Sequence, residues 1–260
     1  MCLILFAYQQ HPHYHLVLAA NRDEYYARPS AALDFWRDAP ELLAGRDLQA
    51  GGTWLGMTRN GRVAAITNYR EGYTAIANAP SRGKLVRDFL QSDASAAQFI
   101  DSLARQDGLY NGFNILLKDE SDFVYYSNRS TTPAQRLKPG LFGLSNHLLN
   151  TPWPKVMRGC EKLNTLLQQS DLSKADVLSD KLLSMLEDRC LPAEDILPAT
   201  GIPIERERIL APMFIQSDSY GTRSSTVLLI DYEGQVTLTE KTIADNKKKR
   251  FEFKIANGIS

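Results

Sequence analysis

The hydrophobic and polar positions of the first fifty residues predict a hairpin followed by a loop. Residues 3–8 and 14–22 are almost continuously apolar, which is typical of strands that are covered on both faces. Residues 9–13, which include a proline, separate these two runs and predict the turn of the hairpin. Residues 25–48 are rich in charge and contain prolines, so we expect a loop there.

The rest of the chain alternates between strand and helix patterns. Residues 51–58 and 62–68 predict two strands, and the Asn60-Gly61 dipeptide between them is a strong hairpin signal. Helical spacing of apolar residues occurs in four segments: residues 85–90, 96–103, 155–168 and 174–188. Further strands are predicted at residues 112–118, 123–127, 141–145, 224–231, 235–240 and 251–255. This order predicts an α+β architecture with helices covering the sheets, and it leaves open whether there is one sheet or two.

Composition narrows the class of protein. Lys and Arg total 30, as do Asp and Glu, so the net charge is zero and gives no sign of a nucleic-acid partner, although a local basic pocket is still allowed. The three cysteines are dispersed, which argues against a disulfide framework or a metal site and fits a reducing compartment. The chain start lacks the basic segment of a signal peptide, and no apolar run approaches the roughly 18 residues of a membrane span. We therefore expect a cytoplasmic protein with no integral membrane association.

Cys2 stands out because it directly follows Met1. Removal of the methionine, which a small second residue allows, would leave a residue with both a thiol and a free α-amine. The thiolate is the nucleophilic form of cysteine, and an α-amine titrates close enough to neutral pH to act as its base. A small second residue is also common at chain starts that have no catalytic role, so position alone leaves both interpretations open.

Four polar residues, 21–24, end the second apolar strand. Arg22 suits a carboxylate or phosphate because its guanidinium is always charged and fork-shaped. Asp23 could orient a chain-terminal ammonium. Neighbouring strand residues point to opposite faces, so this pair can share a pocket only with a bulge or twist. The simpler alternative is a solvated hairpin end with an internal ion pair.

Two other strand ends carry candidate groups. Asn146 follows a predicted strand and could donate its amide to an oxyanion, although asparagine is equally common in turns. Arg223 places a cation just before another strand, or is an ordinary surface arginine. Residues 51–52 are glycines close to Trp54, which fits a flap or a close strand contact.

The four histidines do not indicate a metal or cofactor site. His11, His13 and His15 crowd the first turn, where we expect them to be exposed, and His147 directly follows Asn146. None has a ligand partner at a suitable spacing, so we expect neither a metal site nor a resident cofactor.

The polar segments match a known family in order along nearly the whole chain. They are Met1-Cys2, residues 21–24 with Arg28-Pro29, and residues 51–56, 67–70, 81–83, 111–114, 143–146, 152–155 and 220–226. In these segments the sequence resembles the NRDE family, also called the transport and Golgi organisation protein 2 family. That family looks like a relative of the N-terminal-nucleophile (Ntn) hydrolases, with the cholylglycine hydrolases and penicillin V acylases closest in pattern. The resemblance implies one domain, residues 1–260, folded as a four-layer αββα sandwich.

The resemblance also implies a set of site residues. Cys2 would be the nucleophile, and the other catalytic candidates would be Arg22 and Asp23 beside its amine and the substrate, Asn68 and Asn146 as oxyanion-side amides, and Arg223 near the thiolate. Asn21, Trp54 and His147 are expected to contact the substrate. The acylase pattern separates its arginine and aspartate by two residues, whereas Arg22 and Asp23 are adjacent. We therefore expect at most one of this pair to keep its role, and bile-salt and penicillin substrates to be poor.

Two functions follow as expectations. The first is hydrolysis of an amide or acyl bond in a small molecule, with Cys2 forming an acyl-enzyme. The alternative is a binding protein that carries haem, an acyl-CoA or another lipid in the same cleft, because members of the family are linked to haem trafficking and lipid balance. A haem carrier needs an axial ligand such as cysteine, histidine or tyrosine, for which Cys2, His147 and several tyrosines are candidates.

Overall fold

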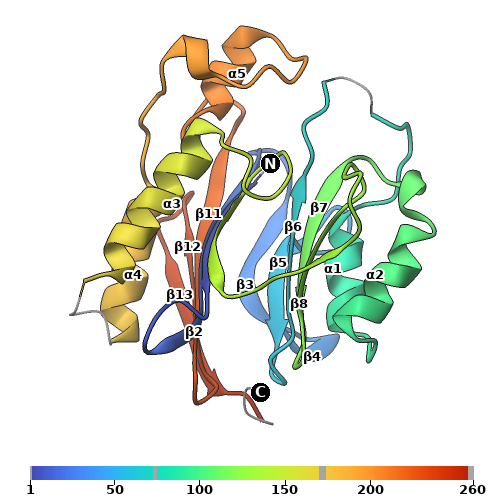
Figure 1. The fold of residues 1–260 in the computed structure, drawn as a ribbon, viewed down its shortest axis with the longest axis vertical. Coiled ribbons are helices and arrows are strands. Elements are labelled where there is room, and N and C mark those ends of the chain that lie inside the picture. Colours follow the sequence, from blue (N-terminus) through green and yellow to red (C-terminus); the bar gives the residue numbers. More distant parts are fainter. Residues whose placement is uncertain (1, 73–74, 170–173, 257–260) are drawn as a thin grey trace.

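The computed structural model describes residues 2–72, 75–169 and 174–256, with Cys2 described by its backbone alone. Met1 and the side chain of Cys2 therefore lie outside the described residues. Two antiparallel sheets face each other, and a pair of helices covers the outer face of each (Figure 1). The predicted four-layer αββα arrangement is confirmed, and the question of one sheet or two is settled as two.

The first sheet has six strands in the order β10-β1-β2-β11-β12-β13, and all neighbours are antiparallel. Their bounds are β1 Cys2–Tyr8, β2 Tyr14–Tyr25, β10 Gly140–Leu144, β11 Tyr220–Asp231, β12 Gln235–Thr242 and β13 Lys248–Lys254. Helices α3 (Pro154–Leu167) and α4 (Ala175–Leu186) cover its outer face. Leu3 and Leu5 of β1 pack under these helices, whereas Ile4 and Phe6 face the other sheet.

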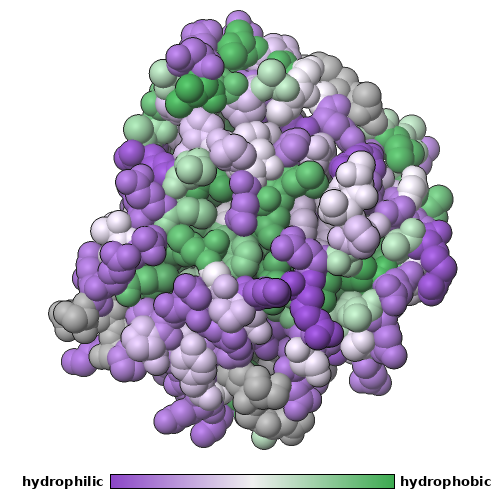
Figure 2. Space-filling model, viewed as in Figure 1, coloured by the Kyte–Doolittle hydropathy of each residue, from purple (hydrophilic) through white to green (hydrophobic). Residues whose placement is uncertain are grey.

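The second sheet has seven strands in sequence order, β3 to β9. Their bounds are β3 Ser30–Trp36, β4 Ala39–Asp47, β5 Leu55–Thr58, β6 Val63–Asn68, β7 Phe113–Lys118, β8 Phe123–Ser127 and β9 Gln135–Arg136. Helices α1 (Gly83–Leu90) and α2 (Ala96–Ala104) cover its outer face. Figure 2 shows apolar residues gathered across the middle of the viewed face, between the two helical layers, with polar residues around them.

The connection from α4 to β11 carries a short helix, α5 (Ile204–Leu210), and one 3-10 turn, Glu194–Ile196; a second 3-10 turn, Asp107–Leu109, precedes β7. Helix α5 lies at the end of the molecule where β1 starts (Figure 1). No helix in the described part of the chain is both long and apolar enough to cross a membrane.

The expected loop at residues 25–48 is wrong, because this segment forms β3 and β4. Its charged residues occupy exposed strand positions, as Asp34 and Glu41 do, while Leu33, Leu42 and Leu43 are buried. A strand with one face exposed to solvent can carry many charges, so charge content alone does not distinguish a strand from a loop.

The expectation that the first-turn histidines are exposed is wrong for two of the three. His15 is 2% exposed on β2, with its ring against Tyr8 and Tyr232. Burial lowers its pKa to about 4, so it is neutral at physiological pH. His11 is buried against Tyr14, and only His13 is exposed. Aromatic packing on both sides of the turn explains the burial.

The predicted strand at residues 51–58 is shorter, because β5 begins only at Leu55 and residues 52–53 pack against the start of α1. The Thr53 backbone N–H donates to the Gly83 carbonyl at 3.0 Å. A Cβ built on Gly52 would lie 2.4 Å from the carbonyl carbon of Gly83 and 2.7 Å from the backbone nitrogen of Lys84. Only glycine allows the two backbones to approach this closely.

We expect Gly52→Ala to lower the free energy of unfolding by about 2–3 kcal/mol, since two backbone segments must separate to admit the methyl group. Gly108→Ala is the matched control, because a Cβ there meets nothing within 4 Å. Urea unfolding of both variants measures the difference. Equal midpoints would show that the contact between residues 52 and 83 is not tight.

Candidate functional site

The candidate site is built where β1 begins and β2 approaches its end. The backbone of Arg22 on β2 pairs with Cys2 of β1 on one side and with Ser224 of β11 on the other. Cys2, the expected nucleophile, and Arg22 are therefore cross-strand neighbours. Directly opposite residues of an antiparallel pair have Cβ atoms about 4.5–5.5 Å apart.

A β-bulge in β11 fixes which residues share a face here. Thr222 pairs with Asp23 and Ser224 pairs with Arg22, so Arg223 is the extra residue between them. Because of this extra residue, paired residues of β2 and β11 point to the same face of the sheet on both sides of the bulge. Ser224 shares the inter-sheet face with Arg22, and Thr222 shares the helix-covered face with Asp23. Bulges are frequent beside functional sites because they re-aim one side chain without ending the strand.

Arg22 faces the layer between the sheets and is only 6% exposed. Its guanidinium carbon lies 4.0 Å from the centre of the Trp54 ring, and Nη1 donates to Ser30 Oγ at 3.4 Å. The indole fits because Gly45 has no Cβ, which would lie 2.5 Å from the ring. The stack fixes a permanent cation beside the backbone of Cys2.

Asp23 lies on the opposite face, with its carboxylate Oδ1 accepting from Thr222 Oγ1 at 2.7 Å. Burial raises the pKa of Asp23, and the nearby positive charge of Lys155 opposes this most strongly. Alternation along β2 thus separates Arg22 from Asp23, and the bulge that could have brought them together lies in β11 instead of β2. Arg22 points into the layer between the sheets, whereas the Asp23 carboxylate bonds to Thr222, although Asp23 also borders the smaller of the two cavities described below.

Asn21 shares the helix-covered face with Asp23 and is 1% exposed. Its Nδ2 donates to the carbonyls of Leu186 and Met213, both at 2.9 Å, and its Oδ1 accepts from Ser225 at 2.6 Å. The whole amide is therefore used to fasten β2 to the helical layer. A direct substrate contact by Asn21 stays a prediction that would require one of these bonds to break.

Two cavities meet at the Arg22–Trp54 stack. The smaller, of about 300 Å³, is also lined by Asn68, Arg82 and Gly83 at the start of α1. The larger, of about 520 Å³, is bounded by β11, β12 and residues 247–249. A ligand that crosses the stack could place one half in each cavity.

Asn68 and Asn146, which the resemblance implies as oxyanion-side amides, are neighbours that join the two sheets. Asn146 is 0% exposed and its Nδ2 donates to the Asn68 carbonyl at 3.0 Å. The Asn146 carbonyl in turn accepts from the Arg70 backbone N–H at 2.7 Å. Asn68 lines the smaller cavity, so its amide is the better placed of the two to meet a ligand.

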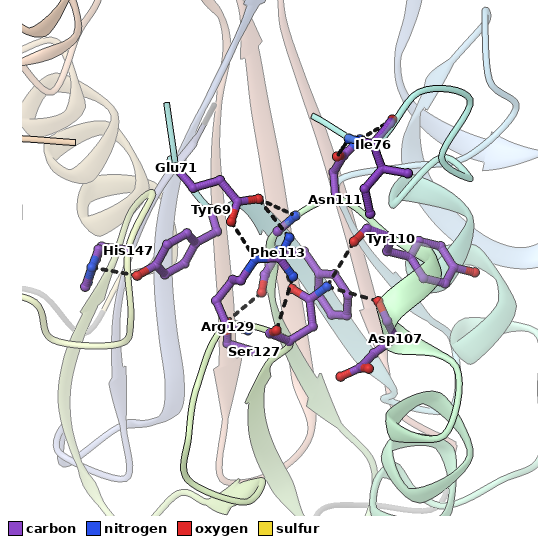
Figure 3. A network of polar contacts seen from close by, with 12 residues as sticks. Tyr69, Glu71, Ile76, Asp107, Tyr110, Asn111, Phe113, Ser127, Arg129 and His147 are labelled. Atoms are coloured by element: carbon purple, nitrogen blue, oxygen red, sulfur yellow. Dashed lines mark hydrogen bonds and ion pairs between the residues drawn. The ribbon is translucent and has the colours of Figure 1, made fainter. Parts of the chain in front are cut away.

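Both ring nitrogens of His147 have protein partners. Nε2 shares a hydrogen bond with Tyr69 Oη at 2.7 Å, shown in Figure 3, and Nδ1 shares one with Thr151 Oγ1 at 2.9 Å. Burial lowers the pKa of His147, which favours the neutral ring. To ligate haem iron, His147 would have to give up one of these bonds.

The segments that follow β6 and precede β7 are held by a polar network (Figure 3). Glu71 forms an ion pair with Arg129 at 2.5 Å and accepts from the Gly112 backbone N–H at 3.2 Å. These bonds fix residues 69–72, which directly follow Asn68 and border a neighbouring cavity. A rigid support of this kind limits how far a bound ligand can displace the Asn68 amide.

Arg223 uses one guanidinium nitrogen to hold the turn after β2. Its Nη1 donates to the carbonyls of Tyr25, Tyr26 and Arg28 at 2.8, 3.1 and 3.1 Å. Its side chain also lines the larger cavity. The expected role near the thiolate stays a prediction, and the visible role of Arg223 is to shape the cavity wall.

Three charged side chains near the site did not stand out as candidates in the sequence. Lys155 is buried in the first turn of α3, and Glu240 is buried on β12 at a position where the alternation requires an apolar residue. That misplaced carboxylate was a detectable signal. Arg70 pairs with Glu207, 137 residues away, for which no local pattern exists.

Among the described residues, no group of three His, Cys, Asp or Glu side chains comes together to hold a metal ion.

Solved structures with the same arrangement are found among hydrolases. An N-acylethanolamine-hydrolyzing acid amidase orthologue of Caenorhabditis elegans matches 88% of this chain and 92% of its own, with a TM-score of 0.51 and 13% identity. Penicillin V acylase of Agrobacterium tumefaciens matches 99% of this chain and 87% of its own, with a TM-score of 0.52 and 11% identity. At these identities the likeness concerns the fold, which is that of the Ntn hydrolases.

Sequence comparison gives a closer relationship. The mouse Transport and Golgi organization 2 homolog is 38% identical over 271 aligned residues, covering 97% of this chain and 96% of its own. The family model described as Transport and Golgi organisation 2 matches residues 1–245. Together with the ordered polar segments and the fold that they build, these matches show that the chain belongs to the Transport and Golgi organisation 2 family.

Proposed function

We propose that the protein is a hydrolase that uses Cys2, freed by removal of Met1, to cleave an amide or acyl bond in a small molecule. One observation carries the proposal: the β1–β2 register pairs Cys2 with Arg22, at the point where two cavities meet. The two solved structures of the same fold are, by name, an amidase and an acylase. We propose the same class of reaction here, in the cytoplasm and without a resident cofactor.

In the proposed reaction, the Cys2 α-amine accepts the thiol proton and the thiolate sulfur attacks the substrate carbonyl. A new C–S bond to Cys2 forms, the scissile C–N bond of an amide or C–O or C–S bond of an ester or thioester breaks, and the proton passes to the leaving group. Water then attacks the thioester, which releases the acid and restores the thiol. Asn68 is the proposed donor to the oxyanion because its side chain borders the smaller cavity.

Arg22 is the member of the adjacent pair to which we assign a role facing the substrate. Its fixed positive charge favours the thiolate over the thiol and can attract an anionic part of a ligand. Asp23 acts from the other face of the sheet, where Thr222 orients it. We assign Asp23 to positioning the start of the chain instead of contacting the substrate.

The cysteines provide a test that needs no substrate. At pH 7 we expect alkylation of Cys2 to be roughly ten times faster than that of exposed Cys190, because a neighbouring cation lowers a thiol pKa by about one unit or more. Cys160 should react slowest, since burial against the α3–β1 core raises its pKa to about 11. Timed labelling followed by peptide mapping measures all three rates in one sample.

Arg22→Met is the informative comparison, because it removes the cation and should bring the rate of Cys2 close to that of Cys190. Labelling of Cys2 that is slower than that of Cys190 throughout pH 6–8 would exclude an activated nucleophile. A retained Met1 or an acetylated Cys2, seen by intact-mass measurement in the natural host, would contradict the proposal equally.

A further inference from the structure

Glu240 occupies an apolar position in the first sheet. Along β12, Val236 and Leu238 point into the core between the sheets, and Glu240 is the next residue on the same face. Its exposed fraction is 2%. Burying a carboxylate at such a position costs free energy unless hydrogen bonds or charges compensate it. The groups around Glu240 should therefore show what compensates its burial.

One carboxylate oxygen joins the two sheets. Glu240 Oε1 accepts from the Leu33 backbone N–H at 2.7 Å. That N–H is available because β3 is irregular between Ala31 and Asp34, where the register with β4 shifts. This bond explains why a polar acceptor stands here. A single acceptor does not require a charged group, however, because a glutamine oxygen would serve equally well.

The charge of Glu240 faces Arg22. Both side chains line the cavity of about 520 Å³, and Ser224 lines the same wall. The strand register explains the arrangement, because Arg22 pairs with Ser224 while Glu240 pairs with Thr226, the next residue on that face of β11. Arg22 and Glu240 therefore lie two strands apart on one face.

We propose that Glu240 is a positioning residue of the candidate site: across the cavity its carboxylate is the counter-charge of Arg22, and it limits the positive field that Arg22 exerts at Cys2 and on a ligand. The inference rests on the proposed function only in taking Cys2 as the reacting group. Asp23 also interacts with the charge of Arg22, but it borders the smaller cavity, whereas Glu240 and Arg22 share the larger one.

The groups that act on Glu240 come from four strands: Arg22 on β2, Leu33 on β3, Ser224 on β11 and Lys249 on β13. Burial raises its pKa, and the opposing influences are the Leu33 N–H, the Ser224 hydroxyl, and the charges of Arg22 and Lys249. Lys249 on β13 is itself paired with Asp34 of β3 at 2.8 Å, which weakens its effect. Arg223, Lys247 and Lys248 also border this cavity, but the charges that lower the pKa of Glu240 are those of Arg22 and Lys249. Because Lys249 is held by Asp34, we take Arg22 as the cation that Glu240 balances.

The test is the alkylation rate of Cys2 in Glu240→Gln, which keeps an acceptor for the Leu33 N–H and removes only the charge. Above the pKa of Glu240 we expect the variant to react about 3- to 10-fold faster than wild type, since a nearby carboxylate disfavours a thiolate. The ratio should fall toward one as the pH drops and the wild-type carboxyl becomes protonated. A merely structural role predicts a ratio that does not change with pH.

Glu252→Gln, on the neighbouring edge strand and exposed, is the matched control and should give a ratio of one at every pH. A Glu240→Gln ratio that is independent of pH, or equal to that of the control, overturns the inference.

A second experiment needs neither a reactive Cys2 nor a Glu240 variant. It is a carboxyl NMR titration of Glu240 in wild type and in Arg22→Met. The pKa should rise when Arg22 is removed. An unchanged pKa overturns the inference, whereas an unreactive Cys2 with a shifted pKa overturns the proposed hydrolase and leaves this coupling intact.

Discussion

Replacing Cys2 with alanine should abolish turnover of any substrate that the wild-type protein hydrolyses, while ligand affinity changes by no more than about threefold. The substitution removes the sulfur that forms the covalent intermediate and little of the surface that binds the ligand. The binding surface comes instead from the Arg22–Trp54 stack and the two cavities beside it. We expect a loss of at least about 1,000-fold, the scale seen when a nucleophile is deleted.

The measurement is a screen of N-acyl amides and acyl thioesters beside a haem titration, each with wild type and Cys2→Ala. Cys190→Ala is the control, because it removes an exposed thiol without touching the site. A haem carrier that uses Cys2 as axial ligand predicts the reverse outcome: no turnover in either protein, and weaker haem binding with a shifted absorption band in the variant. Absence of hydrolysis across the screen, together with Cys2-dependent micromolar haem binding, would falsify the hydrolase.

Replacing Glu207 with glutamine should lower the free energy of unfolding by about 3–5 kcal/mol, because it leaves the Arg70 guanidinium buried without its counter-charge. Arg70 and Glu207 are 8% and 1% exposed, and Arg70 Nη1 pairs with Glu207 Oε2. Thr200 donates to the other oxygen of Glu207, and the Arg70 guanidinium lies 4.8 Å from the Trp153 ring. The pair fastens α5 to the end of β6, next to Asn68.

The measurement is chemical unfolding of wild type, Glu207→Gln and two further variants. It separates the contribution of the Arg70–Glu207 ion pair from the cost of burying one unpaired charge. Glu194→Gln is the control, since Glu194 pairs with Arg208 of the same helix at an exposed position, and this variant should unfold close to the wild-type denaturant concentration. The double variant Arg70→Met, Glu207→Met should recover most of the loss, because no unpaired charge remains buried. If Glu207→Gln unfolds at the same denaturant concentration as Glu194→Gln, the buried pair does not hold this part of the fold.

The sequence by itself determined where most strands and helices form. Apolar runs and helical spacing are local, so the helices predicted at residues 155–168 and 174–188 differ by only one or two residues at each end from the observed Pro154–Leu167 and Ala175–Leu186. Turn chemistry is local as well, and Gly61 takes the positive φ of 89° that the Asn60-Gly61 signal implied. The polar segments identified the family, and with it the αββα fold, because they match the family pattern in order along nearly the whole chain.

Strand register, which sequence pattern does not encode, determined the site itself. Adjacent Arg22 and Asp23 diverge to opposite faces of the sheet, and a bulge at Arg223, outside their own strand, decides which partner each one meets. Glu240 reaches the cavity of Arg22 only because β12 lies one strand beyond β11. Arg70 and Glu207 find each other across 137 residues. Alternation along a strand fixes which residues share a face, but only the pairing of distant strands and helices fixes what that face meets.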